Sequence, residues 1–181
     1  MKRSSPYLLG LIALAATGLL FQTVFSQNFA ARPRVVGGTS AASSPVVVNA
    51  SSLSRAVFKL VNEKRVAAGE KALVWSDDLA RVAFTHSQNM AEYKFFSHRG
   101  LDNKMVSDRA DDAHIGHWRA IGENIAYERG FGDPVEKAVQ LWLDSPSHRD
   151  NMMDAYWHES AIGVAITSDG SYYFTQVFLR K

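Results

Sequence analysis

The 181-residue sequence contains no cysteine, which excludes disulfides, thiolate nucleophiles and cysteine-ligated zinc sites together. It also lacks a phosphate-binding P-loop, a dinucleotide-binding glycine motif and the Gly-x-Ser-x-Gly motif of serine hydrolases. His158-Glu159 begins like the His-Glu-x-x-His zinc motif, but Ile162 stands where the second histidine is required. The net charge is only +2, and no run of lysine and arginine is dense enough to bind nucleic acid. We therefore expect no nucleic-acid partner.

The composition is that of an ordinary globular protein. Hydrophobic residues make up 46% of the chain and charged residues 21%, which suffices for one domain with a hydrophobic core. No internal repeat is present, and no low-complexity run occurs after about residue 50. We expect a single folded domain that is monomeric.

The N-terminus has the pattern of an export signal. Lys2-Arg3 precedes a strongly apolar run from Tyr7 to Phe21, and a basic start before such a run is typical of a secretory signal. Val24-Phe25-Ser26 offers a small-residue cleavage site, and an uncleaved run would approach the length that spans a bilayer. We predict that residues 1–26 are a signal peptide or an N-terminal membrane anchor. The protein is then secreted, periplasmic or held at the cell envelope, and it meets a membrane only through an uncleaved N-terminal segment.

The next segments predict a linker and two helices. Residues 27–52 are rich in Ser, Ala, Thr and Gly without periodicity, which predicts a flexible linker and a folded domain over residues 53–181. Apolar spacing predicts a first helix from Ser54 to Ala68 and a second helix capped by Ser76. His86 lies on the apolar stripe of the second helix, so we assign it a structural role as a core histidine with one polar partner.

The second half of the chain predicts strands as well as helices. Ile121 to Ala126 is expected to be extended, and Asp133 to Trp142 has the cap and apolar face of a helix. Ala161 to Thr167 and Tyr172 to Leu179 are expected to form two strands joined at Asp169-Gly170, a strong hairpin signal. Helices followed by a closing hairpin predict an α+β fold in which helices cover a sheet.

A short helix after Ser145-Pro146 is the first candidate functional element. Serine is a good N-cap and proline fits the first helical position, which places His148 in the first turn. The backbone dipoles there disfavour protonation, so the imidazole of His148 should remain neutral and able to bind a ligand. The alternative is a histidine that only caps or packs at a helix junction.

Two further residues suggest chemistry. His98 follows the end of a helix, and Glu123 lies between apolar residues, where a buried carboxylate needs a cation, a metal or several donors. His98, Glu123 and His148 match the composition of an open zinc site. They lie on separate elements, however, so spacing alone does not establish that they meet.

Several ordered segments resemble the CAP superfamily, which comprises cysteine-rich secretory, antigen 5 and pathogenesis-related 1 proteins, in a cysteine-free bacterial form. The resemblance covers roughly Leu53 to Leu179. It implies a three-layer α–β–α sandwich around a central, mostly antiparallel sheet. The segments that carry it are Val61–Arg65, Trp75–Ala80, Phe96–His98, Gly122–Ile125, Trp142–Asn151, and Ile162–Ala165 together with Tyr173–Phe178.

The resemblance also implies a cleft. Eukaryotic members carry two histidines and two acids that can bind a divalent cation, and here His98 matches the first histidine and Glu123 the first acid. Tyr173 takes the place of the second histidine in the final strand. In bacterial relatives the histidine of the Ser-Pro-x-His segment, here His148, supplies the missing imidazole. We therefore expect a binding cleft of His98, Glu123, His148 and Tyr173, in which the first three residues hold zinc or another divalent cation.

Three functions are compatible with these residues. The first, which we favour, is an exported module that binds a lipid, an envelope glycan or a protein. The second is a metal-dependent peptidase or esterase in which Glu123 activates a zinc-bound water, although Glu123 cannot be both ligand and base. The third is a structural protein in which His98, Glu123 and His148 form a buried hydrogen-bonded network.

Overall fold

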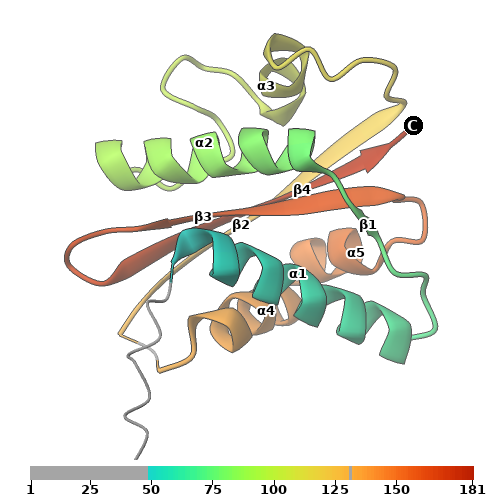
Figure 1. Ribbon diagram of the computed structural model, residues 1–181, viewed down its shortest axis with the longest axis horizontal. Coiled ribbons are helices and arrows are strands. Elements are labelled where there is room, and N and C mark those ends of the chain that lie inside the picture. Colours follow the sequence, from blue (N-terminus) through green and yellow to red (C-terminus); the bar gives the residue numbers. More distant parts are fainter. Residues whose placement is uncertain (1–48, 131) are drawn as a thin grey trace, which may run out of the picture. The chain divides into compact units, whose positions relative to one another are not determined.

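The computed structural model describes residues 49–130 and 132–181 (Figure 1). The predicted signal peptide or anchor at residues 1–26 and most of the predicted linker lie outside these described residues. Within them, no helix is both long enough and apolar enough to cross a membrane.

A four-stranded sheet forms the middle layer, in the order β1–β3–β4–β2. β3 and β4 form the predicted antiparallel hairpin, and β2 runs antiparallel along the other side of β4. β1 pairs with β3 in parallel over two residues, so the sheet is mostly antiparallel and β2 is an edge strand. The strands are β1 (Val74–Trp75), β2 (Ala120–Arg129), β3 (Glu159–Ile166) and β4 (Ser171–Arg180).

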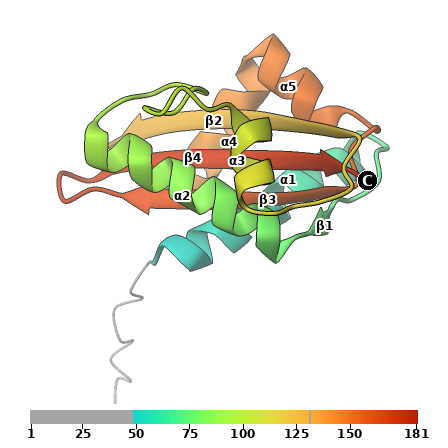
Figure 2. The ribbon, with the colours of Figure 1, turned by 90° about the horizontal axis from the view of Figure 1, so that it is seen from above.

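Helices cover both faces of this sheet. α2 and α3 lie on one face, and α1, α4 and α5 lie on the other (Figures 1 and 2). This arrangement is the expected three-layer α–β–α sandwich. The helices are α1 (Ala50–Ala67), α2 (Asp77–Tyr93), α3 (Val106–Asp112), α4 (Pro134–Asp144) and α5 (Pro146–Met153).

Each face of the sheet has its own hydrophobic core. Trp142 of α4 and Phe174 of β4 are buried on the side of α1, while Leu79 of α2 and Val177 of β4 are buried on the side of α2. The second core is very close-packed, because a Cβ at Gly163 would lie 2.2 Å from the backbone of α2. Only glycine permits this approach, so α2 is held at a fixed height above β3.

The helix ends test the predicted caps. Ser76 accepts a hydrogen bond from the backbone N–H of Leu79, which confirms it as the cap of α2. The first helix begins at Ala50 rather than Ser54, because the side chain of Asn49 accepts from the N–H of Ser52. The prediction of a linker as far as residue 52 is therefore wrong for residues 50–52, which are helical.

The junction before α5 differs in one detail from the prediction. Ser145 occupies the N-cap position and Pro146 the first helical position, as expected. The side chain of Ser145 makes no capping hydrogen bond, however, and its hydroxyl lies 3.5 Å from that of Ser147. Ser145 also ends α4, so one residue serves both helices.

Candidate functional site

The segment after α2 carries His98. A left-handed residue, Lys94, with φ of 55°, ends the helix. The buried His86 then donates a hydrogen bond from Nε2 to the carbonyl oxygen of Ser97, at 2.9 Å. Burial lowers the pKa of His86, which keeps this ring neutral. His86 therefore has the structural role predicted for it, and that role is to fix the backbone immediately before His98.

Glu123 lies on β2 and joins His98 to α3. Its Oε1 is 2.9 Å from Nδ1 of His98, and its Oε2 accepts a 2.5 Å bond from Nη2 of Arg109. Arg109 also donates to the carbonyl oxygen of His98, at 3.1 Å. The carboxylate side chain is only 3% exposed, so the cation that offsets its desolvation is Arg109. Because a carboxylate accepts, Nδ1 of His98 carries the proton and Nε2 remains available.

A second network holds α5 against β2. Asn124, which is buried, donates from Nδ2 to the carbonyl oxygen of His148, at 2.9 Å. Asn151 donates to Oδ1 of Asn124 at 3.0 Å and accepts from the indole N–H of Trp157 at 3.1 Å. These amide bonds set the position of His148 at the start of α5. The site thus joins the two helical layers across the edge strand.

His98 and His148 face a shared cavity of about 420 Å³. Their ring centroids are 6.2 Å apart. Burial, and then the proximity of His98, lowers the pKa of His148, so this imidazole is neutral as the sequence predicted. Desolvation is thus a cause of the neutral form in addition to the helix dipole that motivated the prediction. The cavity is lined by His98, Glu123, Asn124, Ser147, His148, Asp150, Asn151 and Asp154.

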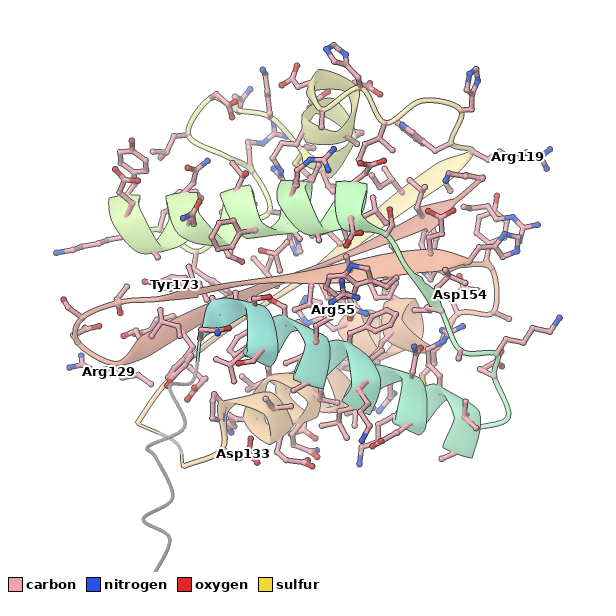
Figure 3. All side chains as sticks on the ribbon, viewed as in Figure 1. Arg55, Arg119, Arg129, Asp133, Asp154 and Tyr173 are labelled. Carbon is pink, nitrogen blue, oxygen red and sulfur yellow. The ribbon has the colours of Figure 1, made fainter. Side chains whose placement is uncertain are left out.

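Tyr173 does not belong to this cleft, which corrects the expectation drawn from the resemblance. The register pairs Tyr173 with Tyr127, whereas Glu123 pairs with Val177. Figure 3 accordingly shows Tyr173 toward the β3–β4 turn, and Asp154, which lines the cleft, toward the other end of the sheet. Tyr173 lines a different cavity.

Sequence reasoning missed Arg109, Asn124 and Asn151. Asn124 carried a usable signal, since a carboxamide in an apolar strand needs hydrogen-bond partners as much as a carboxylate does. Arg109 carried none, because an arginine on a short helix is usually a solvated residue and only the fold brings it to Glu123.

The metal set predicted from the sequence does not fit in full. No group of three or more His, Asp and Glu side chains within residues 49–130 and 132–181 is arranged to hold a metal ion. Glu123 instead gives one oxygen to His98 and the other to Arg109. The two imidazoles remain open, and His98 has the orientation typical of a metal-ligating histidine, with its other ring nitrogen bonded to a carboxylate.

Comparison with known proteins identifies relatives of the chain. The sequence profile described as the cysteine-rich secretory protein family, CAP, matches residues 58–178. The uncharacterized membrane protein YlbC of Bacillus subtilis is 35% identical over 125 residues, which are 69% of this chain and 34% of that protein. The uncharacterized protein YkwD of the same organism is 28% identical over 155 residues, 86% of this chain and 58% of that protein. The chain therefore spans less than two thirds of either relative.

Solved structures agree with the fold. An extracellular protein with an SCP domain from Bacillus anthracis has a TM-score of 0.61 and 30% identity, over 72% of this chain and 41% of that one. An outer surface protein of Borrelia burgdorferi has a TM-score of 0.64 at 19% identity, over 74% of this chain and 96% of that one, and is similar in fold alone. The profile match across residues 58–178 covers more than half of the sequence, and it shows that the chain belongs to the cysteine-rich secretory protein (CAP) family.

Proposed function

We propose that the chain is an extracytoplasmic CAP binding module whose polar cleft holds a divalent cation between His98 and His148 and, with it, a polar ligand of the cell envelope. The observation that carries this proposal is the Arg109–Glu123–His98 chain, whose carboxylate is 3% exposed and which fixes one imidazole beside a second in the same cavity. Export rests on the basic and apolar start of the sequence.

The lining of the cleft favours a polar ligand over a lipid. Imidazoles, carboxylates, carboxamides and a hydroxyl surround the cavity, and no aliphatic or aromatic hydrocarbon side chain is among the described residues that line it. A cavity with such a lining recognises hydroxyls, amides or charged groups through hydrogen bonds. An envelope glycan or a polar protein segment meets this requirement better than an acyl chain does.

Two residues of the cleft would bind the cation, His98 and His148, and Glu123 would orient one of them. Glu123 fixes the tautomer of His98 and directs Nε2 away from itself, as the carboxylate partner of a metal-ligating histidine does. The lowered pKa of His148 keeps the second imidazole in the form that binds a cation. A divalent cation would supply a positive charge that attracts an anionic or carbonyl oxygen of the ligand.

The geometry favours binding over hydrolysis. A zinc hydrolase of the kind considered from the sequence needs a free carboxylate to activate water. Both oxygens of Glu123 are engaged by other side chains, so Glu123 is an orienting group rather than a base. The purely structural interpretation shares the same contacts and is separated from ours by measurement.

Zinc titration of the purified chain by calorimetry tests the proposal. We expect one ion per chain, and at least tenfold weaker affinity in His98→Ala and in His148→Ala with melting temperatures close to that of the parent. Glu123→Gln should weaken affinity about 10–100-fold, as loss of an orienting carboxylate does. His117→Asn is the matched control, because His117 is exposed, lies outside the cleft and has a positive φ that asparagine tolerates.

Two results would contradict the proposal. The first is a parent chain that binds no zinc while both alanine variants unfold much more easily, which would assign the network to structure. The second is zinc binding that neither alanine variant weakens, which would place the ion elsewhere.

A further inference from the structure

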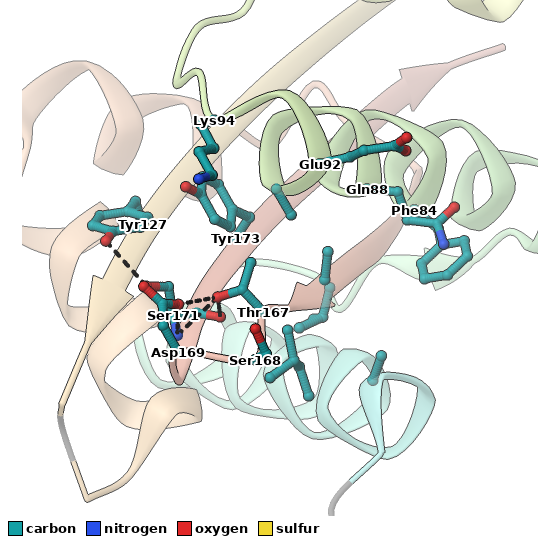
Figure 4. A pocket seen from close by; sticks show the side chains of 15 residues that line it. Phe84, Gln88, Glu92, Lys94, Tyr127, Thr167, Ser168, Asp169, Ser171 and Tyr173 are labelled. Carbon is teal, nitrogen blue, oxygen red and sulfur yellow. Dashed lines mark hydrogen bonds between the residues drawn. The ribbon is translucent and has the colours of Figure 1, made fainter.

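A second cavity, of about 800 Å³, lies between the C-terminal half of α2 and the β3–β4 turn (Figure 4). We call it the aromatic groove and define it by six of its lining residues: Phe84, Gln88, Glu92, Lys94, Tyr127 and Tyr173. None of these residues lines the histidine cleft. The groove is therefore a separate site, and nothing in the proposed function accounts for it.

Aromatic rings meet at one end of this groove. Tyr127 and Tyr173 are cross-strand neighbours on β2 and β4, with ring centroids 4.9 Å apart. Phe96, from the loop after α2, approaches Tyr127 at 6.3 Å. Tyr127 is 41% exposed and Phe96 is 52% exposed. Three rings from three elements thus present an aromatic surface to solvent, a feature that marks binding sites on soluble proteins.

Polar side chains line the helical wall beside these rings. Gln88, Glu92 and Lys94 are exposed and have no hydrogen-bond or ion-pair partner among the described residues. Figure 4 shows them along α2, with Lys94 next to Tyr173. They supply a carboxamide, a carboxylate and an ammonium group, so both donors and acceptors are available to a ligand.

The polar end of Tyr173 is a further donor. Burial raises the pKa of Tyr173, with smaller contributions from Tyr127 and Asp169, so the hydroxyl stays protonated at physiological pH. Tyr127 is held differently, by a 3.2 Å hydrogen bond between its hydroxyl and that of Ser171. One ring of the pair is thus anchored, and the other keeps its hydroxyl for a ligand.

We infer that the aromatic groove binds a saccharide chain. The C–H faces of pyranose rings stack on exposed aromatic rings, and their hydroxyl and acetamido groups bond to carboxamides and charged side chains. The wall from Phe84 to Lys94 is about 15 Å long at the rise of an α-helix, which accommodates about three pyranose units. Exposed rings together with unbonded polar groups suit a saccharide better than an acyl chain, because an acyl chain cannot form hydrogen bonds with the polar wall. The inference does not depend on a cation in the histidine cleft.

Calorimetric titration of the full chain with tri-N-acetylchitotriose, cellotriose and maltotriose tests this inference. We expect at least one trisaccharide to bind at millimolar concentration or below. Tyr173→Ala and Gln88→Ala should each weaken it at least threefold, and Tyr127→Ala at least tenfold, whereas Tyr127→Phe keeps the stacking face and should stay within about threefold. Tyr93→Ala is the matched control, because Tyr93 is an exposed tyrosine of α2 outside the groove.

The outcomes separate this site from the cleft. In buffer without divalent cations, where the cleft holds no ion, His148→Ala should leave saccharide binding at the groove unchanged, even if it abolishes zinc binding in a separate titration. Absence of binding by all three trisaccharides would overturn the inference, and so would binding that Tyr127→Ala and Gln88→Ala leave intact. Binding of a short-chain lipid, and of none of the saccharides, would assign the groove to a different ligand class and would also overturn it.

Discussion

The histidine cleft and the aromatic groove lie along the same strand, yet they are built in opposite ways. Glu123 marks the cleft and Tyr127 the groove, four residues apart on one face of β2. In the cleft the buried carboxylate and the carboxamides bond to other parts of the protein, as Glu123 does with His98 and Arg109 and as Asn124 does with the backbone of α5. On the helical wall of the groove, polar groups such as Gln88 have no partner among the described residues.

This difference follows from where each site lies in the sandwich. The cleft joins the α2–α3 loop to α5 across the edge strand, so its hydrogen bonds also hold the layers together. The groove lies near the β3–β4 turn and the end of α2, and the polar residues of its helical wall, Gln88, Glu92 and Lys94, are exposed. Substitution of the shielded residues Glu123 and Arg109 therefore changes stability as well as binding, whereas a substitution on the exposed groove wall reports binding alone.

The largest effect is expected for Arg109→Met. This change leaves the 3% exposed carboxylate of Glu123 without its cation, and breaking a buried ion pair in this way costs about 3–5 kcal/mol. Urea unfolding measures the loss. The second change Glu123→Gln, made in the Arg109→Met background, should recover part of it by removing the unpaired charge.

The matching change in the groove also replaces a basic side chain with methionine, so the two losses of stability can be compared directly. Lys94→Met removes a cation with no partner among the described residues, so its effect should stay within about 0.5 kcal/mol. If Arg109→Met lowers the free energy of unfolding by less than about 1 kcal/mol, the polar contacts of the cleft contribute no more to stability than those of the groove.

A smaller effect is expected for Gly122→Ala. A Cβ at this position would lie 2.9 Å from the ring of Trp157 and 3.1 Å from Oδ1 of Asn151, so the network that holds His148 must shift. Overpacking of this kind costs about 1–3 kcal/mol, and zinc affinity should fall with it. The control is Gly116→Ala, where the added Cβ meets open space. If Gly122→Ala and Gly116→Ala have equal free energies of unfolding, the hydrogen-bond network around Asn151 accommodates the added methyl group without a loss of stability.

The fold was largely predictable because its signals are local. Short stretches of sequence predict several elements correctly. Examples are the Asp169-Gly170 turn of the hairpin, and the Ser76 cap and apolar stripe of α2. The start of α1 could not be predicted, because the capping hydrogen bond of Asn49 is only one of many side-chain hydrogen bonds that a polar segment could make.

The site was predictable only in part, because its contacts are long-range. His98, Glu123 and His148 were predicted because each is a polar residue at a helix end or between apolar residues, and the structure brings these three together. Arg109 reaches Glu123 only through packing of α3 on the sheet, which no sequence spacing encodes. Tyr173 was assigned to the cleft from the family resemblance, whereas the register of β4 against β2 pairs it with Tyr127 and not with Glu123. Alternation along the sequence could not have corrected this, because any even shift of register preserves it.

Acidification should also distinguish the two sites. Burial lowers the pKa of His148, as it does for His86, from the ordinary value of 6.5. In this range the unfolded chain binds more protons than the folded one, so the free energy of unfolding is highest above about pH 6.5 and falls as the pH drops through the lowered values. The pKa of Tyr173 is raised instead, so the groove adds no change between about pH 7 and pH 5.

Urea unfolding across this pH range provides the measurement. The parent should lose stability steadily on acidification, and His148→Ala should lose less over the same range than the parent does. A parent whose stability is flat from about pH 7 to pH 5 would contradict the lowered pKa of both histidines.

The smallest effect on stability is expected for Gln88→Ala. Its side chain is exposed on α2 and has no partner among the described residues, and alanine is a better helix former, so unfolding should change by less than about 0.5 kcal/mol. Saccharide affinity should nonetheless fall, since the carboxamide is one of the unbonded groups on the groove wall. A loss of affinity without a loss of stability is the signature of a group kept for a ligand. If Gln88→Ala instead lowers the melting temperature as Gly122→Ala does, the groove is part of the architecture in the same way as the cleft, and the contrast between the two sites disappears.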